Sequence, residues 1–324
     1  MENNPIVTVI IPTYNRVAKV GKAIESALKQ TYAHKQIVVI DDGSTDNTAE
    51  LMKKYPEVEY IIQDHGGQAA ARNNGLSRAK GKYIASLDSD DTWNSNFLAS
   101  CVEELEKNNL DFVWANWSQD AGNGKWIDPF ESYSFFKPFL ENRNEYWNIL
   151  SDKELRWLYI NGCPSPSSSL VMRRTSLKST WTETLSIADD WCIIMDMIFA
   201  NQCRAAFTKD KLWFKHIDGT NIHDGRDENE ILQHLYVYDK EIMYKRYHKK
   251  FNREERKQYR ESLVYYLTIY AFQQLTIYRS YNSSMKFFRK AIFTDPKSTL
   301  SLVAYEIRER TKKYFIKEVD TKTV

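Results

Sequence analysis

The sequence lacks several features that would have placed it in a specialised class of protein. Its four cysteines show neither the Cys-x-x-Cys spacing of a zinc site nor the density of a disulfide scaffold, so we expect reduced thiols in a cytoplasmic protein. No stretch stays apolar for the ~18 residues that a membrane-spanning helix needs. The first apolar run follows an acidic rather than a basic lead, which indicates a strand and not a signal peptide.

The chain has 324 residues, 42% of them hydrophobic, which is enough for one large domain and a smaller one. Its net charge of +2 hides an asymmetry. Residues 239–324 hold 20 Lys and Arg against 10 Asp and Glu, so this segment carries +10 and the preceding 238 residues carry −8. The basic, aromatic segment indicates either contact with an anionic surface such as phospholipid or a solvated helical face.

Through the first 120 residues, apolar segments rich in Val and Ile alternate with helical patterns, which is typical of βαβ units. We predict strands over 6–11, 36–40, 60–63 and 83–87, and helices over 17–30, from 45 or 46 to 55, and after 67. Near the C-terminus, apolar residues recur at three- and four-residue steps. The sequence therefore predicts an α/β fold with a mostly parallel central sheet in residues 1–225 and a basic helical region in residues 226–324.

Polar segments follow the predicted strands: PTYN, DDGS, HGG and LDSDD. Ligands of open α/β sheets bind at the carboxyl ends of strands, so all four segments belong to the binding edge. In LDSDD, the carboxylates Asp88, Asp90 and Asp91 crowd like charges, and a divalent metal carrying a diphosphate would offset them. The alternative is an acidic turn that caps a helix beginning near Asn94.

The ordered segments VTVIIPTYNR, VVIDDGSTDNT and GGQAAARNNGLSRAKGKYIASLDSDDTW resemble the nucleotide-sugar domain of family 2 glycosyltransferases, inverting enzymes with the GT-A fold. The resemblance covers roughly residues 5–220. It implies transfer of a sugar from a nucleoside-diphosphate donor, a UDP-sugar first, to a hydroxyl of a glycan, glycoprotein or lipid-linked acceptor. Bacterial cell-surface polysaccharide or glycoprotein assembly is the implied setting, and no nucleic acid is expected as a partner.

The resemblance assigns donor binding to Pro12, Thr13, Tyr14, Asn15, Asp42, Gly67, Arg72, Asp88, Ser89 and Asp90. The first four would hold the nucleobase, and Asp42 would accept a hydrogen bond from it. Arg72 would face the nucleotide at a helix start whose free N–H groups favour anions, or instead form a salt bridge to an acidic loop. The implied cofactor is Mn²⁺ or Mg²⁺, bound by Asp90, with Asp88 nearer the ribose or a metal-bound water and His216 as a third ligand.

A second acidic pair lies in the segment LSIADDWC, residues 185–192. The family carries its catalytic base in such a pair, so the resemblance makes Asp190 the base that deprotonates the acceptor hydroxyl. On the acceptor side, Asp189 stands where the family usually has Glu, and Trp191 would form an apolar wall for a sugar ring. A carboxylate beside Trp and a like charge has a raised pKa, which suits proton abstraction. Both carboxylates are also suited to capping a helix over 191–200.

Other functional classes fit less well. A dehydrogenase would carry GxGxxG after the first strand, and a nucleotidyltransferase would carry a Gly-rich, Lys-bearing loop there; neither is present. A catalytically silent carbohydrate-binding or assembly module stays open, because a sequence gives residue types and not their geometry. For the C-terminal helices three roles stay open: docking on the catalytic domain, homo-oligomer formation, or peripheral contact with the inner face of a membrane that bears a lipid-linked acceptor.

Overall fold

The computed structural model describes residues 5–120, 125–141, 143, 145–200, 202–217 and 226–320, with side chains up to residue 309. The chain divides into two compact units, here called unit 1 (Met1–Arg226) and unit 2 (Asp227–Val324). The boundary expected from the sequence, after residue 225, is one residue away from this division.

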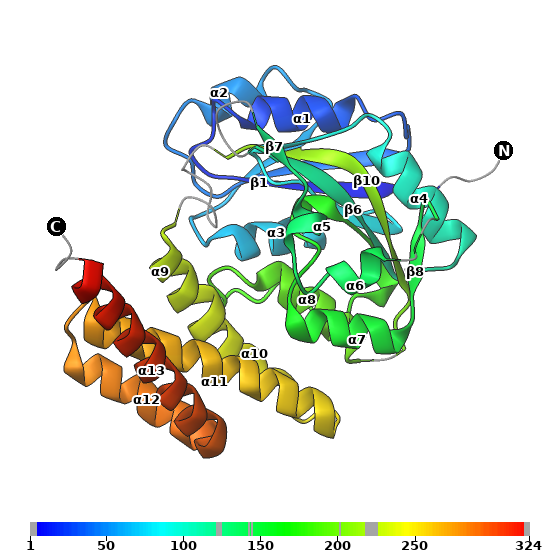
Figure 1. Ribbon diagram of the computed structural model, residues 1–324. Helices are drawn as coiled ribbons and strands as arrows, with labels where there is room; N and C mark the ends of the chain where they lie inside the picture. The colour runs from blue at the N-terminus through cyan, green and yellow to red at the C-terminus, as the bar shows by residue number, and fades with distance from the viewer. Residues whose placement is uncertain are drawn as a thin grey trace. The chain divides into compact units, whose positions relative to one another are not determined.

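Unit 1 is built on one sheet whose strands lie in the order β3-β2-β1-β4-β9-β6-β10-β5 (Figure 1). The strands are β1 Val7–Thr13, β2 Lys35–Asp41, β3 Glu59–Ile62, β4 Tyr83–Ser86, β5 Asp91–Trp93, β6 Phe112–Asp120, β9 Leu170–Arg173 and β10 Ala205–Lys215. The short strands β7 Trp126–Ile127 and β8 Asn148–Leu150 pair with β6 and β10. Along the main order, only β9 and β5 run against the other strands, so the mostly parallel α/β sheet is confirmed.

Helices cover both faces of the parallel half of this sheet. Helices α1 (Val20–Leu28) and α2 (Thr48–Met52) lie on one side of β1, and α3 (Gln68–Ser77) lies on the other (Figure 1). All seven residues of β1 are buried, as a strand covered on both faces requires. Helix α3 approaches β1 closely because it has Gly75 at the contact, where a Cβ would lie 2.5 Å from Ile10 Cγ2.

Two element bounds differ from the sequence prediction for physical reasons. Helix α1 begins at Val20, three residues later than expected, because the segment before it forms a turn beside the next loop. The segment after LDSDD forms β5 before helix α4 (Phe97–Lys107) begins. Strand β5 exists because it pairs antiparallel with β10, with Lys215 opposite Asp91, and a local pattern does not reveal such a long-range pairing.

The second half of unit 1 packs its aromatic residues inward. Its helical segments are α5 Pro129–Ser132, α6 Lys137–Leu140, α7 Asp152–Asn161, η1 Ser167–Ser169, η2 Arg174–Ser176 and α8 Asp189–Ile198. Phe130 and Phe136 are buried against each other and against Phe207 of β10. Core packing therefore accounts for much of the aromatic content of residues 126–166, although Trp126 and Trp157 are exposed.

Unit 2 consists of helices, as the three- and four-residue spacing predicts. They are α9 Glu228–Ile231, the π-helical segment η3 Leu232–Asp239, α10 Lys240–Tyr247, α11 Arg253–Thr276, α12 Tyr281–Thr294 and α13 Pro296–Asp320. The core of the unit is formed by Leu232, Val237, Leu263, Val264, Leu267, Tyr270, Ala271, Phe287 and Ala291. Within the described part of the chain, no helix has the length and apolar character needed to span a bilayer.

Candidate active site

The carboxyl ends of β1, β2 and β4 meet at one edge of the sheet, which brings the predicted polar segments together. Asp42 after β2 donates its main-chain N–H to the carbonyl of Thr13 in β1 at 2.9 Å. Leu87 after β4 donates to the carbonyl of Ile10 in β1, also at 2.9 Å. The parallel pairing therefore places PTYN, DDGS and LDSDD side by side.

Asn15 joins the first two of these loops. Its backbone lies in the left-handed region, with φ 51°, and its N–H donates to Ser44 Oγ at 2.8 Å. Its side-chain oxygen accepts the N–H of Thr45 at 2.8 Å. The neighbouring Tyr14 is 42% exposed and stacks on His65 with ring centroids 4.2 Å apart. A surface cavity of about 390 Å³ is lined by residues 15–19 of the same loop.

The buried carboxylate of Asp42 is already saturated by groups of the chain. Gly66 N–H and Gly67 N–H donate to its two oxygens at 2.9 and 2.7 Å. Gln63 Nε2 donates at 2.7 Å, and His65 Nδ1 lies 2.9 Å from Oδ2. A carboxylate offers about four lone-pair positions. A nucleobase that binds Asp42, as the sequence predicts, must therefore compete with one of these four groups.

The acidic loop after β4 is crowded and mostly buried. Asp90 is paired with Arg16 at 3.4 Å, and burial together with the charge of Asp88 raises its pKa. Asp91 is fully enclosed, and burial followed by the charges of Asp88 and Asp90 raises its pKa well above the usual range. Ser89, the residue before Asp90, is also buried. The loop therefore holds like charges that a bound cation would relieve.

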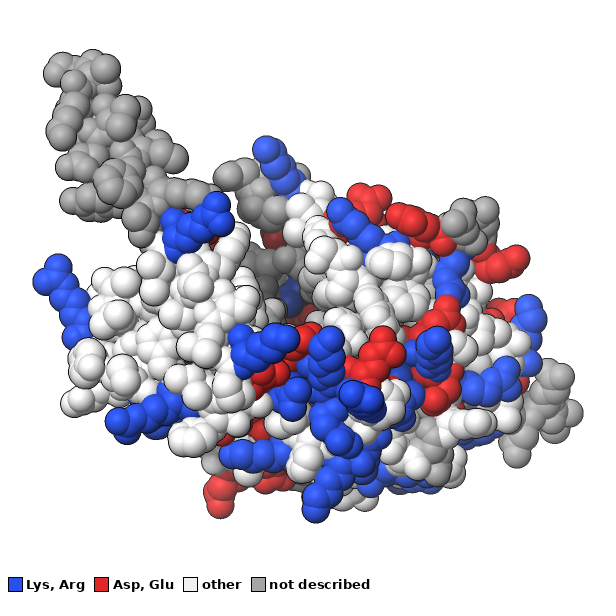
Figure 2. All heavy atoms as spheres, turned by 60° about the horizontal axis from the view of Figure 1, so that its bottom comes forward, with Lys and Arg blue, Asp and Glu red and all other residues white. Residues whose placement is uncertain are grey.

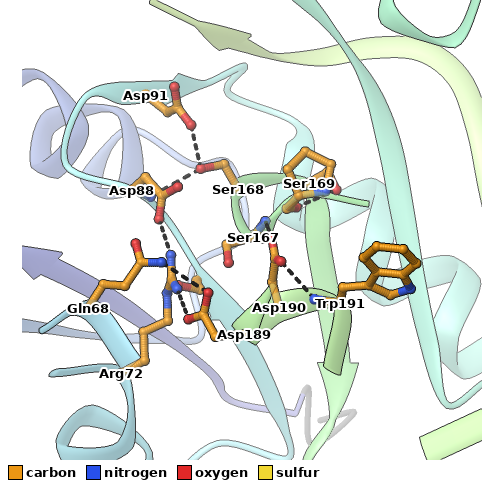
Figure 3. A network of polar contacts seen from close by, with 12 residues as sticks. Gln68, Arg72, Asp88, Asp91, Ser167, Ser168, Ser169, Asp189, Asp190 and Trp191 are labelled. Atoms are coloured by element: carbon orange, nitrogen blue, oxygen red, sulfur yellow. Dashed lines mark hydrogen bonds and ion pairs between the residues drawn. The ribbon is translucent and has the colours of Figure 1, made fainter. Parts of the chain in front are cut away.

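Arg72 links this loop to the second acidic pair (Figure 3). It is 2% exposed, and its guanidinium contacts Asp88 Oδ1 at 2.7 Å, Asp189 Oδ2 at 2.5 Å and Ser86 Oγ at 3.2 Å. The structure thus shows the salt-bridge alternative for Arg72. It also corrects its placement at a helix start, because Arg72 is the fifth residue of α3, which begins at Gln68. Burial acts to lower the pKa of Arg72, but the charges of Asp189 and Asp88 outweigh it and raise the pKa above its ordinary value, so Arg72 stays a cation.

Asp189 and Asp190 form the first turn of α8, with Ala188 as the N-cap residue. Asp189 also accepts from Gln68 Nε2 at 3.0 Å. The Asp190 carboxylate accepts two main-chain N–H groups, from Ser167 at 3.1 Å and from Trp191 at 2.7 Å. Burial, followed by the charge of Asp189, raises the pKa of Asp190 to about 7.

The expected role of Trp191 needs a correction. The side chain is 3% exposed, and its indole N–H donates to the carbonyl of Tyr159 at 2.8 Å. Helix α8 is buried along almost its whole length, so a large apolar residue in its first turn packs into the core. Trp191 therefore presents no open wall to an acceptor sugar.

The donor atoms of the acidic loop suit a divalent cation that keeps most of its other ligands from substrate and water. Asp88, Asp90 and Asp91 supply carboxylate oxygens, which Mg²⁺ and Mn²⁺ prefer. Asp91 Oδ1 is buried and has no hydrogen-bond partner among the described residues. The same residues contain no group of three or more His, Cys, Asp and Glu side chains gathered to hold a metal.

His216 lies close to this loop through the sheet. Its exposed ring has Nε2 3.3 Å from Thr92 Oγ1 and packs edge-on against Trp126. His216 directly follows Lys215, the last residue of β10, which pairs with Asp91. The other histidine of this segment, His223, lies outside the described residues.

Sequence reasoning missed the buried turn η1, which contacts both acidic groups. Ser168 Oγ donates to Asp91 Oδ2 at 2.7 Å, and the Ser167 N–H reaches Asp190. The hydroxyls of Ser167 and of Thr13 at the end of β1 are buried and have no partner among the described residues. The string PSPSSS signals a turn, but nothing in it signals which loops the turn will meet.

The family model described as Glycosyl transferase family 2 matches residues 8–181. Escherichia coli WfgD, named as UDP-Glc:alpha-D-GlcNAc-diphosphoundecaprenol beta-1,3-glucosyltransferase, is 36% identical over 130 residues, which are 38% of this chain and 51% of that protein. The chain matches between 19% and 52% of the length of several other curated relatives.

Two solved structures share the fold at 18% sequence identity. Staphylococcus aureus TarS 1-349 in complex with UDP-GlcNAc has a TM-score of 0.56, with 90% of this chain and 91% of that chain covered. Mannosyltransferase PcManGT from Pyrobaculum calidifontis, in complex with GDP-Man and Mn²⁺, has a TM-score of 0.57, with 95% and 81% covered. The GT-A-type architecture expected from the sequence is thereby confirmed.

Proposed function

Since this chain belongs to glycosyl transferase family 2, we propose that it is an inverting, metal-dependent glycosyltransferase that uses a nucleoside-diphosphate sugar. The observation that carries the proposal is the network in Figure 3, where Asp190, with its raised pKa, and the Asp88–Asp91 loop are joined through Arg72 and Asp189. A UDP-sugar is the first donor to test, because the name of WfgD includes UDP-Glc and TarS was crystallised with UDP-GlcNAc.

In this mechanism Asp190 is the base. Its carboxylate takes the proton of the acceptor hydroxyl, and the acceptor oxygen forms a bond to the anomeric carbon. The bond from that carbon to the diphosphate oxygen breaks, and its electron pair leaves with the nucleoside diphosphate. A pKa near 7 suits a base that must be deprotonated at neutral pH and still accept a proton in the transition state.

The residues that would hold Mn²⁺ or Mg²⁺ are Asp90 first, then Asp88 and His216, with Asp91 Oδ1 as a further oxygen. The support is the crowding of like charges in this loop, the unpaired Asp91 oxygen, and the Mn²⁺ in the PcManGT complex. When bound, such an ion supplies positive charge that offsets the charge developing on the departing diphosphate.

On the donor side, the nucleobase would lie near the end of β1. Tyr14 offers an exposed ring, Thr13 offers an unpaired hydroxyl, and Pro12 and Asn15 shape the loop between them. The Asp42 carboxylate is within the same loop cluster, and its contact with the exposed His65 is the one that a base would most easily replace.

The test is a panel of nucleotide sugars incubated with the protein and Mn²⁺, with nucleoside diphosphate release as the readout. We expect release with one UDP-sugar and its loss when EDTA removes the metal. NMR of the product should then show inversion at the anomeric carbon. Release that ignores EDTA would contradict the metal role, and a retained configuration would contradict the inverting mechanism. Binding of a sugar without any release would favour the silent carbohydrate-binding module.

Unit 2 carries a surface that fits an anionic membrane bearing a lipid-linked acceptor. No Asp or Glu occurs from residue 262 to residue 294, whereas four Lys and Arg do. The exposed large apolar side chains of this stretch are Tyr265, Leu275, Ile277, Tyr278, Tyr281, Ile292 and Phe293. Figure 2 shows, on its left side, uncharged surface with Lys and Arg at its margins.

The basic residues of this stretch are largely available to a ligand. Arg279, Lys286 and Arg289 take part in no ion pair among the described residues, whereas Lys290 is paired with Glu241 at 2.6 Å. Apolar and aromatic side chains combined with Lys and Arg are typical of surfaces that bind anionic lipid. We therefore propose peripheral membrane contact through α12 and the turn before it; the undecaprenol-linked acceptor in the name of WfgD supports this choice.

A further inference from the structure

The buried turn Ser167–Ser169, here called the serine turn, is tied to the acidic loop through its middle residue. Ser168 Oγ accepts the main-chain N–H of Asp88 at 3.1 Å and donates to Asp91 Oδ2 at 2.7 Å. The Ser168 carbonyl accepts the indole N–H of Trp93 at 2.7 Å. The Ser168 hydroxyl thus binds both ends of the acidic loop, Asp88 and Asp91, and the Ser168 carbonyl binds Trp93 just after it.

The first residue of the same turn holds the other half of the site. The main-chain N–H of Ser167 donates to Asp190 Oδ2 at 3.1 Å, while the N–H of Trp191 binds the other oxygen. Figure 3 shows the serine turn between Asp91 and Asp190. Ser167, whose N–H binds Asp190, and Ser168, which binds the acidic loop, are therefore neighbours in the chain.

We propose that the serine turn is a positioning element that sets the Asp190 carboxylate against the Asp88–Asp91 loop. This inference rests on the proposed function, in which Asp190 is the base and the loop faces the donor. The turn is braced internally, since the N–H and the hydroxyl of Ser169 both donate to the carbonyl of Pro166 at 2.9 and 2.7 Å. A movement of the acidic loop is therefore passed to the base through a short, buried and hydrogen-bonded segment.

The N–H of Ser167 also affects the ionisation of Asp190. A donor to a carboxylate favours its charged form, so this bond opposes the effect of burial on the pKa. The other charged or titratable groups that act on or are affected by Asp190 are Asp189, Arg72, Asp88, Tyr159 and Cys163. None of these is altered by a change at Ser167, which makes the N–H separable by mutation.

The first test compares Ser167→Pro with Ser167→Ala. Proline removes the N–H, and the backbone accepts it, because Pro166 has the extended ψ of 158° that a residue before proline requires. Alanine keeps the N–H and is the matched control. We expect Ser167→Pro to move the acid limb of the kcat profile upward by about one pH unit, and Ser167→Ala to leave it in place.

The second test compares Ser168→Ala with Ser169→Ala, two equally buried serines of the same turn. Ser168→Ala removes the anchor of the acidic loop, and we expect kcat to fall about tenfold while the KM for the donor changes less than threefold. Ser169→Ala removes only the hydroxyl bond to the Pro166 carbonyl; the Ser169 N–H still donates to that carbonyl and keeps the turn braced, so kcat should stay within about twofold of the wild type. Thermal melting and calorimetric binding of UDP show whether each variant is folded and binds nucleotide.

The outcomes distinguish a failure of the positioning role of the serine turn from a failure of the proposed function. Folded Ser167→Pro and Ser168→Ala variants with the wild-type kcat and pH profile would overturn the positioning role. If Ser167→Pro shows no melting transition and is therefore unfolded, the kcat of Ser168→Ala alone tests the positioning role. An Asp190→Asn variant with wild-type turnover overturns the proposed function itself, whatever the serine variants do. An inactive Asp190→Asn beside normal serine variants removes only this inference.

Discussion

The two units place their charged residues in opposite ways. Unit 1 buries carboxylates and an arginine at one edge of a sheet, where Arg72 contacts Asp88 and Asp189 from three different segments of the chain. Unit 2 has a largely apolar core and, apart from the buried Lys240, leaves the Lys and Arg of its described residues at least partly exposed. A buried charge must find a partner, so its neighbours are specified, whereas exposed charges are free to meet a ligand of many shapes. We therefore expect chemistry in unit 1 to depend on single residues. Binding by unit 2 should depend on the total number of its exposed cations.

Replacing Asp190, the proposed base, should have the largest effect. Asp190→Asn keeps the shape of the side chain but cannot accept the proton, so we expect kcat to fall by about 10² to 10⁴-fold with donor binding retained. Asp196→Asn is the control, because Asp196 is a buried carboxylate of the same helix that is bound by Ser179 Oγ. Initial rates and calorimetry with the donor check both. Equal losses in the two variants would mean that the helix, and not the base, is at fault.

Removing the central cation should come next, and it should affect folding. Arg72→Met leaves Asp88 and the buried Asp189 without their counter-charge, so we expect the free energy of unfolding to fall by about 3 to 5 kcal/mol. Arg78→Met, at the exposed end of the same helix, should change it by less than about 0.5 kcal/mol. Urea unfolding measures both. A stable Arg72→Met would show that the buried network contributes little to the fold.

The free energy of membrane binding by unit 2 should change in proportion to the number of Lys and Arg removed from its surface. Each Lys or Arg near an anionic membrane contributes about 1 kcal/mol, so Lys286→Gln with Arg289→Gln should weaken binding to vesicles containing phosphatidylserine by roughly 30-fold. Lys249→Gln with Lys250→Gln, a basic pair elsewhere in unit 2, is the control. Vesicle sedimentation gives the affinities. Failure of the wild-type protein to bind such vesicles while it forms dimers in solution would instead favour oligomer formation through these helices.

Within one pH unit of the midpoint, the pH dependence of kcat should be the smallest of these effects, and it arises in unit 1. As the proposed base, Asp190 must be deprotonated to act, and its pKa is raised to about 7, so kcat should fall as pH drops through 7, by about tenfold per unit below it. Activity should be level above this range until other groups titrate. Rates measured with saturating donor from pH 5 to 8.5 give the profile. An acid limb near pH 4 would show that the base has an ordinary carboxylate environment.

The sequence predicts the site best where the position of one strand determines the position of the next. The exits of β1, β2 and β4 had to meet because parallel strands end at the same edge, and the polar segments after them could be read from the apolar runs alone. The LDSDD and LSIADDWC segments were recognised as two acidic groups. That Arg72 joins them was open from the sequence, since a salt bridge between residues 117 positions apart has no local signal.

The remaining features depend on contacts between distant segments. Strand β5 forms only by pairing with β10, and the serine turn matters only because α8 and the acidic loop pack against it. The family resemblance placed Trp191 toward an acceptor, but its side chain is apolar and α8 is buried, so it packs into the core. Residue type predicted the chemistry of these positions, and packing decided which way the side chains face.

The contact between Arg72 and Asp189 also has a consequence for the order of events during synthesis. Translation delivers the first four strands long before α8, so Arg72 emerges more than a hundred residues ahead of its second partner. Until α8 has been made and packed, the growing polypeptide has the loops proposed to bind the nucleotide but lacks Asp190, the proposed base. A ribosome-bound fragment that ends before residue 189 is thus expected not to consume nucleotide sugars.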